Sequence, residues 1–397
     1  MHINELSYGF GAAKSSIREI AAAAAARAAQ LGPDKVFNFS IGNPSVPAPA
    51  AVRASIEKNI SLPPTEVHGY TPAAGLPQVK QKLAQSLCRR FGENAATPES
   101  LYLTCGAAAS ISISLHALIN PGDEVIVIAP YFPEYRVWIQ HAGACCVEVM
   151  SRESDFQIDA DALRAAITKN TKVVIVNSPN NPVGTIYTRQ NLEEAAAVLR
   201  ERSAHFGTDI VLLADEPYRE ITYGEEVPWI PDVYEKTIVC YSYSKSLSLP
   251  GERIGWVLVP PMHPDYTQLI AAIAGSGRAL GFVCAPALFQ RVLADCVDEP
   301  ADVATYARNR AALTEGLSAL GYTFIEPAGA FYLWVKALED DAEAFCQRAN
   351  EHELFPVPSN SFGCTGWVRL GYCVSYKTIV NSMDSWAAVA RSYRQAQ

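Results

Sequence analysis

The stretch TKVVIVNSP (171–179) decides the fold class of this chain, because the apolar residues within it follow one another without a break. A strand with one solvated face alternates apolar and polar residues, whereas Val173 to Val176 are all apolar. A short, β-branched, unbroken run predicts a strand that is buried on both faces. Such strands are typical of parallel sheets covered by helices.

Five further runs of this kind lie between residues 100 and 260. They are SLYLTC (100–105), DEVIVIAP (123–130), TDIVLLADEP (208–217), KTIVCYSYS (236–244) and RIGWVLVP (253–260). Helix-like segments such as ALRAAITKN (162–170) and QNLEEAAAVLRERSAHF (190–206) lie between them. The alternation predicts an α/β domain with right-handed crossover connections.

The two ends of the chain differ from this central part. After about Ala301, helix-like and strand-like segments alternate from NRAALTEGLSAL (309–320) to GWVRLGYCV (366–374), which predicts a smaller α+β unit. The Pro-rich crossover IGNPSVPAPA (41–50) separates the first residues from the sheet. We therefore expect a large domain at 46–290 and a small domain made of 1–45 and 291–397.

Composition and charge exclude several classes of protein. With 49% hydrophobic and 18% charged residues, the chain of 397 residues is neither disordered nor fibrous. Its 32 basic and 41 acidic residues include no dense Lys/Arg cluster, which argues against nucleic acid as a partner. The ten cysteines lack both the CxxC spacing of a zinc site and the density of a disulfide scaffold, so we expect no metal and a reducing, cytoplasmic setting.

No segment predicts a membrane span or an export signal. The alanine run 21–26 follows Arg18 and Glu19 and is interrupted by Arg27, which indicates a helix. No window reaches the roughly 18 uncharged apolar residues of a membrane helix. The glycine-rich stretches GFGAA (9–13) and GSGRALG (275–281) do not follow strand-like runs, so they are weak signals of a nucleotide enzyme.

Polar and aromatic residues follow five of the predicted strands. Taken alone, each of these residues can be explained by an ordinary structural role, as a turn residue, a core aromatic, a helix cap or a surface lysine. The carboxyl ends of parallel strands meet at one edge of a sheet, where ligands bind. We therefore expect one cleft to be lined by Gly106 to Ala108, Tyr131 to Pro133, Asn180 to Pro182, Asp215 and Lys245.

One ligand, pyridoxal 5′-phosphate, accounts for all of these positions at once. Its aldehyde forms a Schiff base with a lysine amine, for which Lys245 is placed, and its ring nitrogen needs a carboxylate such as Asp215. Its phenolate oxygen needs a donor, and its ring face an aromatic. Its phosphate suits a helix N-terminus together with hydroxyl groups and an arginine.

These motifs resemble the class I/II aminotransferases, the fold-type-I pyridoxal-phosphate enzymes typified by aspartate aminotransferase. The likeness runs from about Phe39 to Val374. It implies a large domain with a mainly parallel seven-stranded sheet covered by helices, plus a smaller α+β domain from the N- and C-terminal segments. In SYSKSLSLPGERIG (242–255), the resemblance makes Lys245 the catalytic Schiff-base lysine and places Ser242 and Arg253 on the phosphate.

Other motifs of the family assign the remaining cofactor contacts. ADEPY (214–218) implies that the pyridinium nitrogen meets Asp215 and that the phenolate oxygen meets Tyr218. NNPVG (180–184) carries a phenolate-binding amide onto Asn181, and PYFPEY (130–135) implies that the cofactor ring stacks on Phe132. TCGAAAS (104–110) resembles the phosphate-binding turn, formed here by Gly106, Ala107 and Ala108.

The resemblance also implies a homodimer with shared active sites. HGYTPAAGLPQVKQKL (68–83) resembles the segment whose tyrosine, here Tyr70, reaches the neighbouring subunit's phosphate. FSIGNP (39–44) and WVRLGY (367–372) match the segments that hold a substrate's α-carboxylate, which implies substrate contacts for Gly42, Asn181 and Arg369. Arg278 lies roughly where the family can supply a cation for a second carboxylate across the dimer. PAGAFYLW (327–334) is a further landmark, to which we assign no role.

The predicted activity is transfer of an amino group between an L-amino acid and a 2-oxo acid by a ping-pong mechanism. Lys245 would move a proton, for which its pKa must fall well below the usual value of about 10.4. The same lysine and aspartate serve a carbon–sulfur β-lyase or a decarboxylase, so these activities stay open at this point. A regulator that has kept the fold is a further alternative, and the amino acid and oxo acid are open too.

Overall fold

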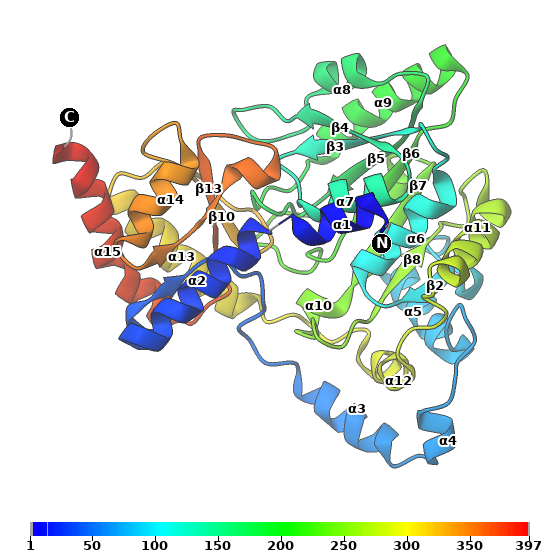
Figure 1. Ribbon diagram of the computed structural model, residues 1–397. Coiled ribbons are helices and arrows are strands. Elements are labelled where there is room, and N and C mark those ends of the chain that lie inside the picture. Colours follow the sequence, from blue (N-terminus) through cyan, green and yellow to red (C-terminus); the bar gives the residue numbers. More distant parts are fainter. Residues whose placement is uncertain (1–2, 14, 396–397) are drawn as a thin grey trace.

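The computed structural model describes residues 3–13 and 15–395, and its largest sheet has seven strands. Their order is β2-β8-β7-β6-β5-β3-β4, and β8 runs in the direction opposite to the other six strands. Helices flank this sheet, which confirms the predicted α/β class (Figure 1). The strands are β2 (Leu101–Thr104), β3 (Glu124–Ala129), β4 (Cys145–Met150), β5 (Thr171–Asn177), β6 (Val211–Asp215), β7 (Thr237–Ser242) and β8 (Gly255–Leu258).

The unbroken apolar runs are buried on both faces of the sheet. In β5, Val174 and Val176 belong to one buried cluster, whereas Val173 and Ile175 belong to another. Successive side chains of a strand point to opposite faces, so each face has its own apolar layer. The helices of this part are α3 (Ala50–Ile60), α4 (Pro64–Val67), α5 (Pro77–Phe91), α6 (Ala107–Leu118), α7 (Glu134–His141), α8 (Ala160–Ala166), α9 (Arg189–Phe206), α10 (Tyr243–Ser246), α11 (Tyr266–Ala279) and α12 (Ala287–Cys296).

One strand of the sheet, β4, lies outside the predicted runs. It is an edge strand, paired only with β3, and Val149 is its one fully buried residue. Cys145, Glu148 and Met150 are exposed. A half-exposed edge strand lacks the unbroken apolar run that marks the central strands, which explains why the sequence pattern missed it.

The smaller part combines the two ends of the chain, as predicted. β1 (Phe37–Asn38) pairs in parallel with β11 (Leu354–Phe355), which joins an N-terminal segment to a C-terminal one. Beside this pair lies a four-stranded antiparallel sheet in the order β12-β13-β10-β9. Its strands are β9 (Phe324–Ile325), β10 (Tyr332–Lys336), β12 (Val357–Pro358) and β13 (Trp367–Gly371), and the helices of this part are α2 (Ser16–Leu31), α13 (Val303–Ala319), α14 (Ala342–Asn350) and α15 (Tyr376–Gln395).

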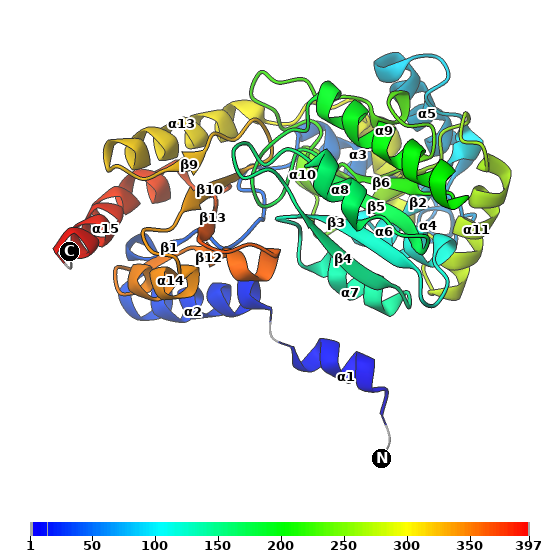
Figure 2. The same ribbon diagram turned by 90° about the horizontal axis from the view of Figure 1, so that it is seen from above.

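The two parts lie side by side, with the small one at one end of the large sheet (Figure 2). The division at residues 46 and 290 stays a prediction. Single 3₁₀ turns complete the backbone at Pro33–Lys35, Pro98–Ser100, Ile230–Asp232 and Ser359–Phe362.

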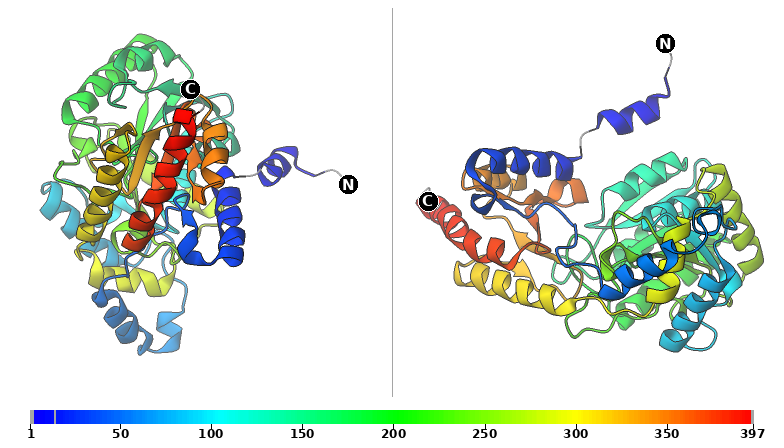
Figure 3. Two further views of the ribbon diagram at one scale, coloured as in Figure 1. Left: turned by 90° about the vertical axis from the view of Figure 1, so that its left-hand side faces the viewer. Right: turned by 90° about the horizontal axis from the view of Figure 1, so that it is seen from below.

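The first helix, α1 (Glu5–Ala12), stands away from the rest of the chain (Figure 3). None of its residues is buried. The stretch GFGAA lies largely within this helix and GSGRA lies within α11, so neither forms a loop between a strand and a helix. Among residues 3–13 and 15–395, no helix is long and apolar enough to cross a membrane.

Candidate active site

A cavity of about 510 Å³ lies at the carboxyl ends of the central strands. Asn177, Asp215 and Ser242, the last residues of β5, β6 and β7, all line it. Residues of the smaller part close its other side, among them Gly42 and Arg369. The cavity brings together the predicted residues Gly42, Ala107, Ala108, Phe132, Asn181, Asp215, Tyr218, Ser242, Lys245, Arg253 and Arg369.

Lys245 projects from α10, a single helical turn that directly follows β7. Ser242 caps this turn, because its hydroxyl accepts a hydrogen bond from the Ser244 N–H at 3.2 Å. The Lys245 amine donates to the Gly42 carbonyl at 2.6 Å. The pKa of Lys245 is lowered to about 8, mainly by burial; Cys373 raises it, and Arg369 and Arg253 contribute to the lowering. An amine with this pKa is partly neutral near pH 7 to 8, so it can act as a nucleophile and a base.

Asp215 is buried, and one of its carboxylate oxygens has no hydrogen-bond partner. The Tyr135 hydroxyl donates to Oδ2, whereas Oδ1 is unpaired within the part of the chain that the structure describes. Burial raises the pKa of Asp215 to about 7, helped by Glu216 and opposed by the hydrogen bond from Tyr135. A protonated ring nitrogen in the cavity would pair with Oδ1 and stabilise the charged carboxylate. This orphaned oxygen therefore fits the ring of pyridoxal 5′-phosphate.

The start of α6 and the loop after α10 form a candidate anion site. Gly106 caps α6 with φ +88° and without a side-chain hydrogen bond, so the first N–H groups of the helix are available. A Cβ at Gly106 would lie 2.8 Å from Arg253 Nη2, so the glycine lets the guanidinium approach. The Ser242 and Ser244 hydroxyls are 2.7 Å apart, and Arg253 donates to Ser244 Oγ at 3.4 Å. These groups match the charge and hydrogen-bonding needs of a phosphate.

Arg369 lies on β13 with 2% of its surface exposed. It donates to Asn181 Oδ1 at 3.0 Å and to the Ser40 carbonyl at 2.6 Å. Its guanidinium carbon is 4.5 Å from the ring centroid of Tyr332. No carboxylate pairs with Arg369 among the residues that the structure describes, and its Nε has no partner there. A buried guanidinium without a counter-charge suits a carboxylate ligand.

Tyr218 and Tyr332 meet within the cavity. Their hydroxyls are 3.0 Å apart, and burial raises the pKa of Tyr218 well above its usual value. A Cβ at Gly42 would collide with the Tyr332 hydroxyl, which explains the glycine in FSIGNP. Tyr332 belongs to PAGAFYLW, to which the sequence reasoning gave no role, and the structure places it in the cavity.

Several other lining residues were missed. Tyr135 and Trp138 lie on one face of α7, and together with Phe132 they form an aromatic wall. The ring centroid of Phe132 is 5.8 Å from that of Tyr135 and 6.0 Å from that of Trp138. The spacing of three residues between Tyr135 and Trp138 could have predicted this arrangement, because residues three apart share a helix face. The other missed lining residues are Ile17, Arg18, Ile111, Glu134, Asn177, Pro217, Ser244 and Pro250.

Three residues that the sequence analysis considered for the site do not line the cavity in their own chain. Tyr70 is 98% exposed, and Arg278 is exposed on α11. Gly106 does not line the cavity either, although it caps the helix whose Ala107 and Ala108 do. The contact of Tyr70 with a second subunit stays a prediction, and the role of Arg278 stays open.

Comparisons with known proteins agree on one family. The sequence model of the family "Aminotransferase class I and II" matches residues 34–384. An aspartate aminotransferase of Streptomyces avermitilis is 31% identical over 388 residues, which cover 92% of this chain and 91% of the relative.

Two solved structures extend the comparison. The crystal structure of an amino transferase from Eubacterium rectale is 46% identical, with a TM-score of 0.97 over 99% of each chain. The structure of aspartate aminotransferase from Thermus thermophilus with maleate is 27% identical, with a TM-score of 0.87 over 98% of this chain and 100% of the other.

Proposed function

Because this chain belongs to the class I and II aminotransferases and is itself an aminotransferase, we propose that the cavity around Lys245 is its active site and binds pyridoxal 5′-phosphate. The reaction is transfer of an amino group between an L-amino acid and a 2-oxo acid by the ping-pong mechanism general to the family. One observation carries the proposal. A lysine with a lowered pKa lines the same cavity as a buried carboxylate, one oxygen of which has no partner among the described residues.

The residues of the cavity divide between the parts of the cofactor. The start of α6, Ser242 and Arg253 would hold the phosphate, with Ser244 beside them. Asp215 would hold the ring nitrogen, Asn181 and Tyr218 the phenolate oxygen, and Phe132 would pack on the ring. The bound cofactor supplies an aldehyde for Lys245 and a ring that accepts electrons from the substrate.

The protein's own residues orient the substrate and move the proton. Arg369 would bind the α-carboxylate of the amino acid, with Asn181 as its fixed neighbour at 3.0 Å. The Lys245 amine would then remove the proton from the substrate's α-carbon, since its pKa of about 8 suits a base near neutral pH. The small part contributes Gly42, Tyr332 and Arg369, and the large part contributes Lys245, so the two parts must come together for the reaction.

A lysine substitution tests the assignment. Lys245→Ala should lower turnover by more than about a hundred-fold, because no second lysine among the described residues lines the cavity. After borohydride reduction, mass spectrometry should find the cofactor attached to Lys245 in the wild type and unattached in the variant. The matched control is Lys336→Ala, which removes an exposed lysine of β10. Attachment and turnover that survive in Lys245→Ala would refute the proposed site.

The proposal includes a homodimer in which Tyr70 serves the partner's active site. The 98% exposure of Tyr70 supports this, because a tyrosine that contacts only its own chain is rarely so exposed. It also includes a reducing, cytoplasmic setting, which the ten free cysteines support.

A further inference from the structure

The turn that carries Lys245 also carries a buried hydroxyl group that the proposed function does not use. Ser246 is the last residue of α10 and does not line the active-site cavity. Its hydroxyl oxygen lies 2.9 Å from that of Tyr241, a buried residue of β7. Both residues line a separate cavity of about 340 Å³. The pair therefore lies on a different side of α10 from the reacting amine.

The direction of the hydrogen bonds behind α10 follows from the groups that form them. Tyr241 has one hydroxyl proton, which it donates to Glu220 Oε2 at 2.6 Å. Its oxygen must then accept the proton of Ser246. Arg90, near the end of α5, donates to the other oxygen of Glu220 at 2.8 Å. The hydrogen bonds thus run from Ser246 through Tyr241 to a carboxylate that an arginine neutralises.

These hydrogen bonds join α10 to a second segment of the proposed active site. Glu220 lies on the segment that begins with Asp215 at the end of β6. The same segment contains a buried ion pair of 2.5 Å between Glu216 and Arg219, which restrains it. Tyr241 therefore links α10 to a segment that is itself held in place.

The turn α10 needs such an anchor because it has only four residues, too few for a helix that is stable by itself. Its start is held by the Ser242 cap and by a backbone hydrogen bond of 3.1 Å. The Lys245 amine adds a contact with the Gly42 carbonyl, but it gives this contact up whenever it reacts or moves a proton. The contact between Ser246 and Tyr241 does not involve the amine, so it can persist throughout the reaction.

From these contacts we propose that Tyr241 is a positioning residue for the reaction. Its hydroxyl holds α10 through Ser246 and ties it to the Asp215 segment through Glu220, so that the Lys245 amine keeps its place while it moves a proton. The inference rests on the proposed function, because it takes Lys245 to be the base. Proton transfer depends steeply on distance and orientation, so a small displacement of the turn slows it.

Tyr241→Phe tests the inference in the holoenzyme, because it removes the hydroxyl and keeps the ring, which stacks on Trp256 at 4.9 Å. The value of kcat should fall about ten-fold, whereas KM for the amino acid should change by less than about two-fold, since Arg369 still binds the α-carboxylate. Ser246→Ala should have the same effect. The double variant should lose no more than either single variant, because both substitutions interrupt one chain of hydrogen bonds.

A measurement on the chain without cofactor separates the position of the amine from the stability of the fold. Burial is the main cause of the lowered pKa of Lys245. A displaced turn should expose the amine, so in Tyr241→Phe its pKa should rise by about 0.5 or more toward the ordinary value of about 10.4. The rate of reductive methylation of Lys245 as a function of pH, followed by mass spectrometry of its peptide, measures this pKa.

The matched control is Tyr234→Phe. Tyr234 is another buried tyrosine of the large part, and its hydroxyl donates to the Ile210 carbonyl at 2.7 Å. It does not line the active-site cavity. Its substitution should lower the stability of the fold, as loss of a buried hydrogen bond does, without changing kcat or the pKa of Lys245.

The outcomes distinguish the inference from the proposed function. Wild-type values of kcat and of the Lys245 pKa in both Tyr241→Phe and Ser246→Ala would overturn the inference alone. Equal losses in Tyr234→Phe would do the same, because the effect would then come from general destabilisation. Losses that add up in the double variant would show that Tyr241 does not act through Ser246. If borohydride fixes no cofactor on Lys245 of the wild type, the proposed function fails and the inference fails with it.

Discussion

Asp215 is held in an environment that favours its protonated form. Its pKa of about 7 in the chain without cofactor exceeds the usual value of about 3.9 because the carboxyl group is buried. Between these two values, the folded chain keeps a proton that the unfolded chain has lost. The contribution of Asp215 to the free energy of unfolding should therefore fall as the pH rises from about 4 to about 7.

Asp215→Asn should remove this pH dependence. Without cofactor, the variant should be more stable than the wild type by about 2–4 kcal/mol at pH 8, and the difference should shrink toward pH 5. The asparagine oxygen can still accept the hydrogen bond from Tyr135. Urea unfolding of both proteins at the two pH values measures the difference.

Asp209→Asn provides a control with the opposite sign. The hydrogen bond from Lys236 lowers the pKa of Asp209, so this substitution should slightly destabilise the protein at pH 8. A stability difference between Asp215→Asn and wild type that is the same at pH 5 and pH 8 would contradict the assigned cause. In that case the substitution would act through packing rather than through the proton.

Whether a site residue could be predicted from the sequence depends on where that residue lies in the fold. Asp215, Asn181 and Lys245 follow apolar strands, so the topology of a parallel sheet alone places them at one edge. Arg18 and Tyr332 come from the small part, and their distance from the sheet in the sequence hides their place in the cavity. Their positions depend on how the two parts pack against each other. No local sequence pattern carries this information.

At the scale of secondary structure, short strands also could not be predicted from a local sequence pattern. The central strands were predicted because burial on both faces gives an unbroken apolar run. β1, β9, β11 and β12 have two residues each, too few for any period to show. The predicted helix 162–170 ends at Ala166, because Thr168 and Thr171 form a turn in which the Thr168 N–H donates to Thr171 Oγ1 at 3.0 Å.

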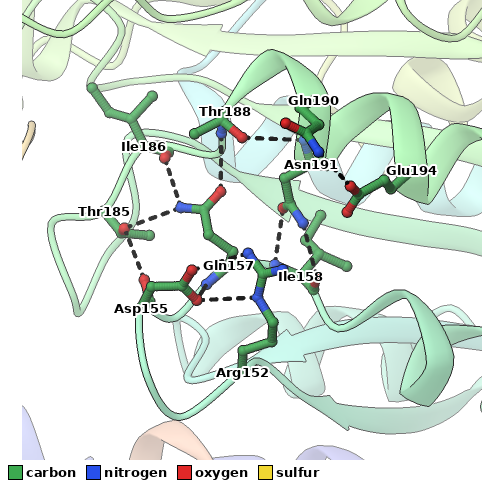
Figure 4. A network of polar contacts seen from close by, with 10 residues as sticks. All are labelled: Arg152, Asp155, Gln157, Ile158, Thr185, Ile186, Thr188, Gln190, Asn191 and Glu194. Atoms are coloured by element: carbon green, nitrogen blue, oxygen red, sulfur yellow. Dashed lines mark hydrogen bonds and ion pairs between the residues drawn. The ribbon is translucent and has the colours of Figure 1, made fainter.

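The loop between β5 and α9, which carries Asn181, is fixed by a buried side chain (Figure 4). Gln157 donates to the Ile186 carbonyl at 2.9 Å and accepts from the Thr188 N–H at 3.0 Å. Thr185 in turn accepts from the Asn180 N–H at 2.8 Å, next to Asn181. One glutamine thus anchors the backbone on which the proposed cofactor contact depends.

Gln157→Ala should destabilise the protein by about 1–3 kcal/mol, because it leaves buried backbone groups of this loop without partners. Urea unfolding at neutral pH measures the change. The matched control is Gln190→Ala, in which an exposed glutamine loses its contact with Glu194 at 3.0 Å. That change should stay within about 0.5 kcal/mol. Equal effects of the two substitutions would show that Gln157 does not anchor the loop.

At the scale of the whole molecule, the chain has apolar surface that its own fold does not cover. The helix α1 stands apart (Figure 3), and the exposed fractions are 55% for Ile3, 45% for Leu6 and 64% for Tyr8. Tyr70, with 98% of its surface exposed, lies on the large part. An isolated helix of eight residues is not stable by itself in water, so α1 needs a further surface to pack on. These features fit the proposed homodimer.

Mixed dimers test whether Tyr70 acts across the subunit interface. Lys245→Ala should be inactive by itself. The activity of Tyr70→Ala should be about ten-fold lower than that of the wild type if the tyrosine binds phosphate. A dimer with one subunit of each kind contains one site with an intact lysine and, from the other subunit, an intact tyrosine. Mixing the two variants under conditions of subunit exchange should therefore raise the activity above that of either variant alone.

The reciprocal mixture makes the test decisive, because it predicts a loss instead of a gain. When wild type exchanges with the double variant Tyr70→Ala, Lys245→Ala, the intact lysine in each mixed dimer faces a partner without the tyrosine. If Tyr70 acts on the partner's site, the activity per intact lysine should fall toward that of Tyr70→Ala. If Tyr70 acts within its own chain, this activity should stay at the wild-type value and the first mixture should show no gain. Sharing of active sites across the dimer would then be wrong, although the assignment of Lys245 would be unaffected.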